Sequence, residues 1–237
     1  AEVVAVRLGK PLRWPFNVSD VLLVGTRVGA VSRRGKYLWL PLTRAGLPAG
    51  GLLLHLGMSG SLRILQAGDA PTTHDHVDIL FEERLIIRYH DPRRFGAMLW
   101  LAGRKLEHPL LDKLGPEPFS PTFDGDYLYT TSRGRRISIK EFIMNGHVVV
   151  GVGNIYASES LFMAGINPKR HAGTISRARC IKLAESIKQT LANAVRAGGS
   201  SLRDYVQADG ELGYFQSQAQ VYDRDRLPCN TCGSLIR

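Results

Sequence analysis

The chain of 237 residues is long enough for one large or two modest domains, and 44% hydrophobic with 22% charged residues is ordinary for a globular protein. The charge balance is less ordinary, because 31 Lys and Arg face 21 Asp and Glu, and residues 131–237 alone carry 15 basic against 8 acidic side chains. This excess favours a polyanionic partner, although many basic proteins bind none; since no apolar run approaches a bilayer span, we expect a cytoplasmic protein with no membrane contact.

The first half of the chain has the pattern of β-structure. Short β-branched or alternating segments, separated by Gly, Pro and Asp turns, predict a sandwich or barrel. They cover residues 1–8, 27–42, 50–57, 59–66, 76–82, 84–91 and 96–102. The chain opens in a strand pattern at Ala1 without an initiating Met. We therefore expect an earlier element before Ala1.

The second half has the pattern of helices. Around residues 114–136, three prolines and a polar, basic tail indicate a linker. Beyond it, apolar residues recur at helical spacing in 135–146, 154–165 and 175–199, and the last segment ends at a Gly pair suited to a C-cap. A β domain followed by a helical domain is predicted.

The stretch VVVGVGNIYASES, residues 148–160, presents backbone amides and one side-chain amide at the start of a predicted helix. This is the geometry of an anion site, but the Lys-Ser/Thr of a nucleotide loop and a full GxGxxG are both missing. A turn of this kind between two helices can hold a DNA phosphate, with Asn154 donating a further hydrogen bond. Alternatively, its glycines only permit close packing of helices.

Three cysteines in 237 residues do not make a disulfide framework. Cys180 falls in a helical pattern and is interpreted as a small buried apolar residue. Cys229 and Cys232 form Cys-Asn-Thr-Cys-Gly, a knuckle that supplies half of a tetrahedral zinc site. Either the second half lies beyond Arg237, or this pair is a redox pair or accidental.

Several longer motifs carry a family resemblance. The chain resembles bacterial formamidopyrimidine-DNA glycosylase in the order and spacing of these motifs, which extend across nearly all of it. They are HLGMSGSLRI (55–64), HDHVD (74–78), DPRRFGA (91–97), LGPEP (114–118), VVGVGNIYASESLFMAGINP (149–168), GYFQSQAQVY (213–222) and PCNTCG (228–233).

The resemblance implies a multi-domain α+β fold. Its parts are a β-sandwich-like catalytic domain at 1–118, a linker at 119–132, a helix-two-turn-helix DNA-binding domain at 133–222 and the first half of a zinc finger at 223–237. Cys229 and Cys232 match the first two ligands of one structural Zn²⁺. The second cysteine pair is not in these 237 residues. Without it we expect zinc binding to be weak or lost.

The resemblance also implies an activity. Such proteins excise oxidised purines, chiefly 8-oxoguanine and formamidopyrimidines, from duplex DNA and then cut the abasic strand by β,δ-elimination; we expect a monomer. The attacking group is the amine of an N-terminal proline beside a Glu, and an α-amine with a pKa of about 8 is partly neutral at cellular pH. Ala1 is not that proline, so we expect a segment before it.

Site residues follow by matching positions. Lys36, in the family's lysine-bearing strand, is implied to contact phosphate at the lesion and assist proton transfer. The alternative interpretation is that Lys36 is one of three solvated cations at a basic strand edge. Met58, Arg93 and Phe95 match the residues that fill the hole left by the flipped base, a role suited to their chemistry, although all three could be loop-packing residues. Endonuclease VIII, which prefers oxidised pyrimidines, carries different residues at these three positions.

The DNA-binding matches are His74, Arg93, Arg135, Lys140 and Asn154, and residues 206–214 match a mobile lid.

Two alternatives come from other functional classes. His74, His76 and Asp78 spell HxHxD, the beginning of a metal-hydrolase signature, but Ile79 stands where that signature requires His. A non-catalytic DNA-binding protein on the same scaffold is the second alternative. Borohydride trapping on a lesion duplex would separate both from an imine-forming glycosylase.

Overall fold

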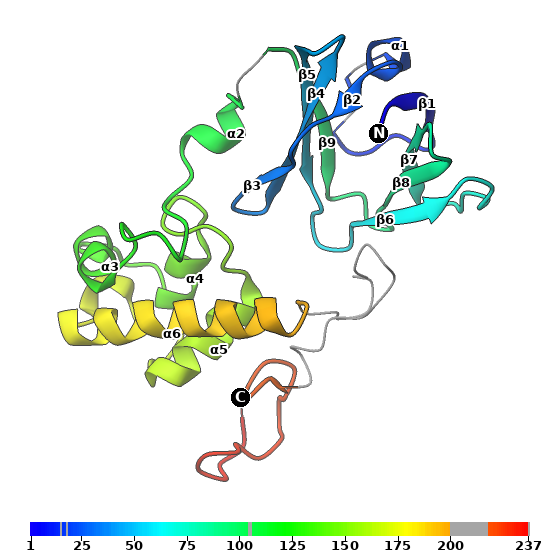
Figure 1. The fold of residues 1–237 in the computed structure, drawn as a ribbon. Coiled ribbons are helices and arrows are strands. Elements are labelled where there is room, and N and C mark those ends of the chain that lie inside the picture. Colours follow the sequence, from blue (N-terminus) through cyan, green and yellow to red (C-terminus); the bar gives the residue numbers. More distant parts are fainter. Residues whose placement is uncertain (15, 18, 104–105, 200–217, 237) are drawn as a thin grey trace. The chain divides into compact units, whose positions relative to one another are not determined.

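The computed structural model describes residues 1–237 except 15, 18, 104–105, 200–217 and 237. It divides into two compact units, the first holding Ala1–Pro109 and the second beginning at Leu110. The first consists mainly of strands and the second of helices (Figure 1), which confirms the multi-domain α+β class. In the part of the chain that is described, no helix has the length and apolarity needed to cross a bilayer. The predicted lid at 206–214 lies outside the described residues.

The first unit is a sandwich of two sheets in which all pairings are antiparallel. One sheet has the order β1-β7-β8-β6, and the other has the order β2-β4-β5-β9 with β3 paired to β4. The strands are β1 (Val3–Leu8), β2 (Arg27–Val28), β3 (Ser32–Arg34), β4 (Tyr37–Arg44), β5 (Leu47–His55), β6 (Ser61–Gln66), β7 (Asp75–Phe81), β8 (Leu85–His90) and β9 (Ala97–Leu101). Each predicted β segment overlaps at least one strand.

Alternate residues of both sheets fill the space between them. Leu52 and Leu54 of β5 are buried in one cluster with Val77 and Ile79 of β7 and with Tyr89 of β8. Because strand side chains alternate between faces, the spacing of two residues puts these groups on the inward side. Each large apolar side chain buried here stabilises the unit by about 1.5–3 kcal/mol. The packed sheets therefore form a fixed frame for the loops at their ends.

The helical unit contains the three helices that the periodicity predicted. The helices of the chain are α1 (Asp20–Leu23), α2 (Pro109–Asp112), α3 (Gly125–Ser132), α4 (Ile139–Met144), α5 (Asn154–Ala164) and α6 (Arg177–Arg196), with a 3-10 turn η1 (Ala172–Thr174). Helix α6 is followed by Gly198 and Gly199 with φ angles of 72° and 93°, which only glycine adopts readily. The predicted end at the Gly pair is thus confirmed.

Residues 119–132, for which we expected a linker, instead contribute to the helical core. Asp124 accepts a hydrogen bond from the backbone N–H of Tyr127 (2.7 Å) and caps α3. Phe123 and Leu128 are fully buried in the same cluster as residues of α5 and α6. The prolines that suggested a linker all precede α3, where they remove no helical hydrogen bond.

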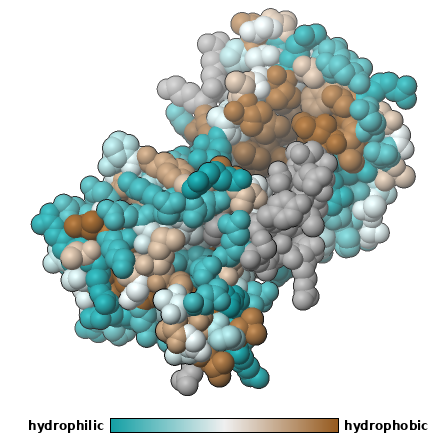
Figure 2. All heavy atoms as spheres, turned by 60° about the horizontal axis from the view of Figure 1, so that its bottom comes forward, coloured by the Kyte–Doolittle hydropathy of each residue, from teal (hydrophilic) through white to brown (hydrophobic). Residues whose placement is uncertain are grey.

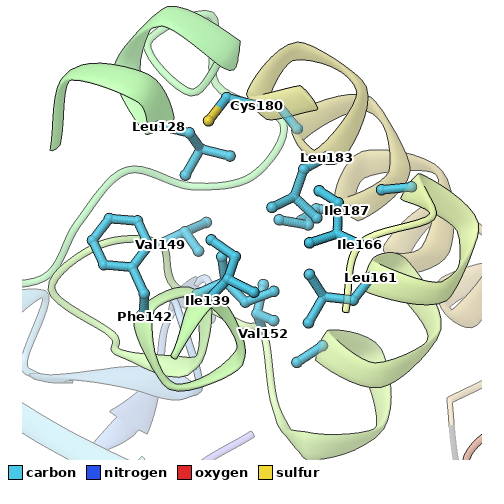
Figure 3. Packing of buried hydrophobic residues seen from close by; sticks show 14 of the residues in the cluster. Leu128, Ile139, Phe142, Val149, Val152, Leu161, Ile166, Cys180, Leu183 and Ile187 are labelled. Atoms are coloured by element: carbon cyan, nitrogen blue, oxygen red, sulfur yellow. The ribbon is translucent and has the colours of Figure 1, made fainter. Parts of the chain in front are cut away.

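Residues of α3, α4, α5 and α6 share one core (Figure 3). Leu128 of α3, Phe142 of α4, Leu161 of α5 and Leu183 of α6 point toward a common interior. Cys180 of α6 lies in this cluster, and burial raises the pKa of its thiol. The interpretation of Cys180 as a small buried residue is confirmed, and the surrounding packing holds the turns between the helices.

The two units differ in polarity on the face drawn in Figure 2. Hydrophilic side chains cover most of the helical unit there, whereas apolar side chains gather over part of the β-sandwich. The residues of the helical unit, 110–200 and 214–237, carry 15 basic (12 and 3) against 9 acidic (7 and 2) side chains. The helical unit therefore combines a hydrophilic face with an overall positive charge, as a polyanion-binding domain requires.

Candidate functional site

Three loops meet at one end of the β-sandwich. Residues 56–60 join β5 to β6, residues 67–74 join β6 to β7, and residues 91–96 join β8 to β9. Apart from Lys36, these loops hold all the residues of this unit that were predicted to contact DNA or to fill the hole left by the flipped base. These residues are Met58, His74, Arg93 and Phe95.

Hydrogen bonds join the three loops. The backbone N–H of Asp91 donates to the carbonyl of His74 (3.0 Å), and that of Arg93 donates to Oγ of Ser59 (3.3 Å). Residues far apart in sequence are thereby brought together, which motif matching alone does not establish. The roles assigned to them remain predictions, but their proximity is a structural fact.

The side chains at the tips of these loops are exposed although two of them are apolar. Met58 is 70% exposed and Phe95 is 43% exposed. The guanidinium carbon of Arg93 lies 4.9 Å from the centroid of the Phe95 ring, within the range of a cation–π contact. Large apolar groups held out toward solvent on anchored loops suit insertion between bases better than packing of a loop.

Lys36 lies in the turn Gly35–Lys36 between β3 and β4, not within a strand as expected. The next residue, Tyr37, pairs across the sheet with His55, which leads into loop 56–60. Lys36 is exposed, yet protein atoms around it displace enough water to lower its pKa. Burial, followed by the charge of Lys36, also lowers the pKa of His55. The lysine thus belongs to the same end of the sandwich as the three loops.

The HxHxD motif does not form a metal site in the described part of the chain. His76 is buried, and its Nδ1 and Nε2 lie 2.7 and 2.9 Å from the carbonyl oxygens of Lys10 and Asp91. Asp78 accepts hydrogen bonds from Arg7 and Arg88 instead. The described residues include no group of three metal-ligating side chains. His76 and Asp78 are therefore structural, which disfavours the metallohydrolase alternative.

In the helical unit, Asn154 is the exposed first residue of α5. No side chain caps this end, because the N-cap position is Gly153. Gly151 has a φ of 85°, and a Cβ at that position would meet nothing within 4 Å. Gly151 is therefore required by the backbone conformation of the turn and not by close helix packing, which supports the anion-binding interpretation.

Arg135 is exposed and Lys140 half-buried, and their backbone is anchored to the turn that follows α5. The carbonyl of Arg135 accepts the N–H of Gly173 (2.9 Å), and the N–H of Lys140 donates to the carbonyl of Pro168 (3.3 Å). Asn154 stands at the opposite end of α5 from this turn. Among the described residues no hydrogen bond joins Asn154 to Arg135 or Lys140, so none of the three side chains is occupied by another.

Comparison with known proteins matches both units. The formamidopyrimidine-DNA glycosylase N-terminal domain matches residues 1–98, and the formamidopyrimidine-DNA glycosylase H2TH domain matches residues 114–206. A formamidopyrimidine-DNA glycosylase of Stutzerimonas stutzeri is 56% identical over 227 residues, which cover 95% of this chain and 82% of that relative. The chain belongs to the formamidopyrimidine-DNA glycosylase family. It is accordingly an enzyme of the DNA glycosylase class, as the motifs implied.

Solved structures of the family share the fold. The MutM (Fpg) protein of Thermus thermophilus has a TM-score of 0.84 and 36% identity, over 99% of this chain and 84% of that one. A mutant Fpg of Lactococcus lactis, solved in complex with a Fapy-dG containing DNA, has a TM-score of 0.88 and 29% identity, over 99% of this chain and 85% of that one. The β-sandwich and helical unit are therefore those of the glycosylase family.

Cys229 and Cys232, the two predicted zinc ligands, lie on a tight hairpin. Leu227 and Ile236 are joined by a backbone hydrogen bond (3.0 Å), and the N–H of Thr231 donates to Sγ of Cys229 (3.4 Å). Hydrogen bonds from the backbone of Thr231 and Cys232 lower the pKa of Cys229. This arrangement fits a knuckle that presents two thiolates, which is half of the set that zinc needs.

One buried carboxylate was not anticipated from the glycosylase motifs. Glu159 of α5 is 5% exposed, and its two oxygens accept the backbone N–H groups of Gln220, Val221 and Tyr222 at 2.8–3.0 Å. Glu159 thus ties the helix that begins at Asn154 to the chain leading into the cysteine hairpin. A charged residue in an otherwise apolar helical pattern was the available signal.

Proposed function

We propose that the protein is a bifunctional DNA glycosylase and AP lyase of base excision repair. It removes oxidised purines, 8-oxoguanine and formamidopyrimidines, from duplex DNA after flipping the base, and it cuts the strand through a Schiff base and β,δ-elimination. It acts as a monomer in the bacterial cytoplasm. The main support is the gathering of Lys36, Met58, His74, Arg93 and Phe95 at one end of the sandwich of a family member.

Base removal requires that the target leave the stack and that the gap be filled. Met58 and Phe95 provide exposed apolar surface for the gap, and Arg93 provides donors that reach the acceptors of the orphaned cytosine. This set favours oxidised purines over the pyrimidine specificity of endonuclease VIII, in which these residues differ. His74 on the adjoining loop supplies a phosphate contact.

Lys36 is proposed to contact the phosphate at the lesion and to transfer a proton during elimination. Its lowered pKa supports this role, because a group whose pKa lies nearer to the working pH transfers protons more readily. The attacking amine implied by the family resemblance is that of an N-terminal proline and is not among residues 1–237. Arg135, Lys140 and Asn154 hold the sugar-phosphate chain.

One structural Zn²⁺ completes the proposal, with Cys229 and Cys232 as two of its four ligands. The role of this ion would be only to hold the hairpin, because four thiolate ligands leave no coordination position open to water or substrate. In the full-length protein, Cys229→Ser should lower the zinc content well below the one ion per chain of wild type. Elemental analysis and the absorption of the Co²⁺-loaded protein measure this. Unchanged metal content in the variant would contradict the assignment.

The activity is tested by borohydride trapping with the full-length protein. Duplexes that carry 8-oxoguanine, a formamidopyrimidine, an oxidised pyrimidine or no lesion are incubated with and without borohydride. We expect a covalent protein–DNA adduct that needs borohydride and forms fastest with the two oxidised purines. Binding without any adduct would indicate the non-catalytic alternative. A preference for the oxidised pyrimidine would indicate an endonuclease VIII-like enzyme.

A further inference from the structure

The two loops that carry Met58, Arg93 and Phe95 share a buried carboxylate. Asp91 is 0% exposed; its Oδ1 accepts the hydroxyl hydrogen of Ser59 at 2.6 Å, and its Oδ2 accepts the N–H of Gly96 at 2.9 Å. Ser59 belongs to loop 56–60, whereas Gly96 belongs to loop 91–96. One carboxylate therefore bonds to both loops.

The same carboxylate also reaches the frame of the sandwich. The hydroxyl of Tyr89, a fully buried residue of β8, lies 3.3 Å from Oδ2 of Asp91 and 3.3 Å from the carbonyl of His55 in β5. Burial, followed by the charge of Asp91, raises the pKa of Tyr89, so the phenol keeps its proton and donates it. Tyr89 thus connects the loops to strands of both sheets.

Ser59 closes the network. Its hydroxyl donates to Asp91 and accepts the N–H of Arg93 at 3.3 Å. Among the described residues no ion pair involves Asp91, so the donors that hydrogen-bond to its carboxylate are all uncharged. A buried carboxylate that depends on three donors, here Ser59, Gly96 and Tyr89, is sensitive to the loss of any one of them.

The backbones of the two loops are in direct contact. A Cβ on Gly57, which has a φ of 67°, would lie 2.6 Å from the N of Gly96 and 2.7 Å from the carbonyl carbon of Phe95. A Cβ on Gly96 would lie 1.8 Å from the Tyr89 hydroxyl. With no space between them, the loops cannot shift independently.

From this geometry we propose that Asp91, with Ser59 and Tyr89, is a positioning residue that unites loops 56–60 and 91–96 into one rigid mount. Met58, Arg93 and Phe95 then enter the duplex as a unit in a fixed mutual arrangement. A rigid mount loses less conformational entropy on insertion than two separate loops would. This inference rests on the proposed function, because it assumes that these side chains fill the gap.

The test uses Ser59→Ala and Tyr89→Phe in the full-length protein, because each removes one hydroxyl with little change in volume. Thr26→Val is the matched control, since the buried hydroxyl of Thr26 bonds to the carbonyl of Leu23 in the same unit but outside the network. Asp91→Asn is added if thermal unfolding shows that it folds. Single-turnover excision of 8-oxoguanine is compared in a duplex and in a mismatched bubble, in which no stacked gap has to be filled.

We expect Ser59→Ala to slow duplex excision by about tenfold, the effect of losing one hydrogen bond to a charged group, and to leave bubble excision within about twofold. Tyr89→Phe should act in the same direction, and Thr26→Val should change neither rate. In a background with Met58→Ala and Phe95→Ala, the Ser59→Ala effect should become smaller, because two of the three side chains that the network positions are gone.

Equal slowing of both substrates by Ser59→Ala, or full additivity with the double variant, would overturn the positioning role alone. A wild-type protein that excises from neither substrate would overturn the proposed function, and this inference with it. Hydrogen exchange adds a second criterion: Ser59→Ala should speed exchange at Gly96 on the other loop. Unchanged exchange there would show that the loops are not coupled through Ser59.

Discussion

At the scale of single residues, the role proposed for Lys36 depends on the surroundings of its side chain. It sits in a two-residue turn beside His55, and partial desolvation lowers its pKa. An ordinary lysine, with a pKa of about 10.4, gives up its proton rarely near neutral pH. The turn thus makes Lys36 a better proton-transfer group than its sequence context suggests.

Substitution of Lys36 should affect strand cleavage more than DNA binding. We expect Lys36→Gln to lower the single-turnover cleavage rate by about a hundredfold, the usual contribution of a positioned acid or base. If Lys36 acts in its charged form, cleavage falls as pH rises through its lowered pKa, and Lys36→Arg should move that fall to higher pH. Rates measured across pH 6–10, with binding as the control, test this. If cleavage by Lys36→Arg falls at the same high pH as cleavage by wild type, Lys36 is not the group whose loss of a proton causes the fall.

At the scale of elements, the sheet that contains β7 is held by a ladder of charges. Asp78 of β7 stands opposite Arg7 of β1 and Arg88 of β8, and it accepts hydrogen bonds from both. Burial acts to raise the pKa of Asp78, but these hydrogen bonds outweigh it and the net pKa is lowered. The pairing therefore fixes three strands beneath the loops that carry the site.

The ladder predicts a pH-dependent stability. Because the folded-state pKa of Asp78 is depressed, its stabilisation is complete above about pH 4, the unfolded value, and is lost as pH falls through the folded value. We expect Asp78→Asn to lower the free energy of unfolding by about 3 kcal/mol at pH 7. The difference from wild type should shrink below about pH 4. Denaturation at pH 7 and pH 3, with exposed Glu83→Gln as control, tests this; a difference independent of pH would refute it.

Glu159 links helix α5 to the C-terminal hairpin in a similar way. Replacing it by Gln removes the charge and one acceptor oxygen from three backbone N–H groups. We expect local opening of residues 218–236 to become easier by about 2 kcal/mol. Hydrogen exchange of that segment measures the change, with Glu185→Gln on the exposed face of α6 as the matched control. Equal protection in both variants would show that Glu159 does not hold the hairpin.

At the scale of the whole molecule, the formal net charge of +10 makes DNA binding sensitive to salt. The excess is largest after residue 130, where the helical unit presents Arg135 and Lys140. Contacts to phosphate carry no sequence information, so they should add equally to damaged and intact DNA. In the proposed function, recognition of damage is then left to the loops of the β-sandwich.

Arg135→Ala should weaken binding to all duplexes alike and reduce the slope of log K against log salt by about 1. Arg179→Ala, which removes the same charge from an exposed position on α6, should leave the slope nearly unchanged. Titrations between 50 and 200 mM salt with lesion and intact duplexes distinguish the two variants. Equal slopes for both would mean that only net charge matters.

The sequence by itself determined the elements and the family. Alternation in the first half and helical spacing in the second predicted β4, β5, α5 and α6, because these patterns follow from the local geometry of the chain. The motifs around Met58, Arg93 and Asn154 carried the resemblance. Prolines before α3 misled the prediction of a linker, since composition does not tell where a helix resumes after them.

Only the tertiary structure decided which residues share a site. Ser59 and Asp91 are 32 residues apart, and their hydrogen bond exists because β5 and β8 end at the edge of the sandwich where β6 and β9 begin. Glu159 likewise acquires its role only when residues 220–222 fold back onto α5. Such partners depend on packing between distant segments, and a local pattern holds no information about which distant group a buried charge will meet.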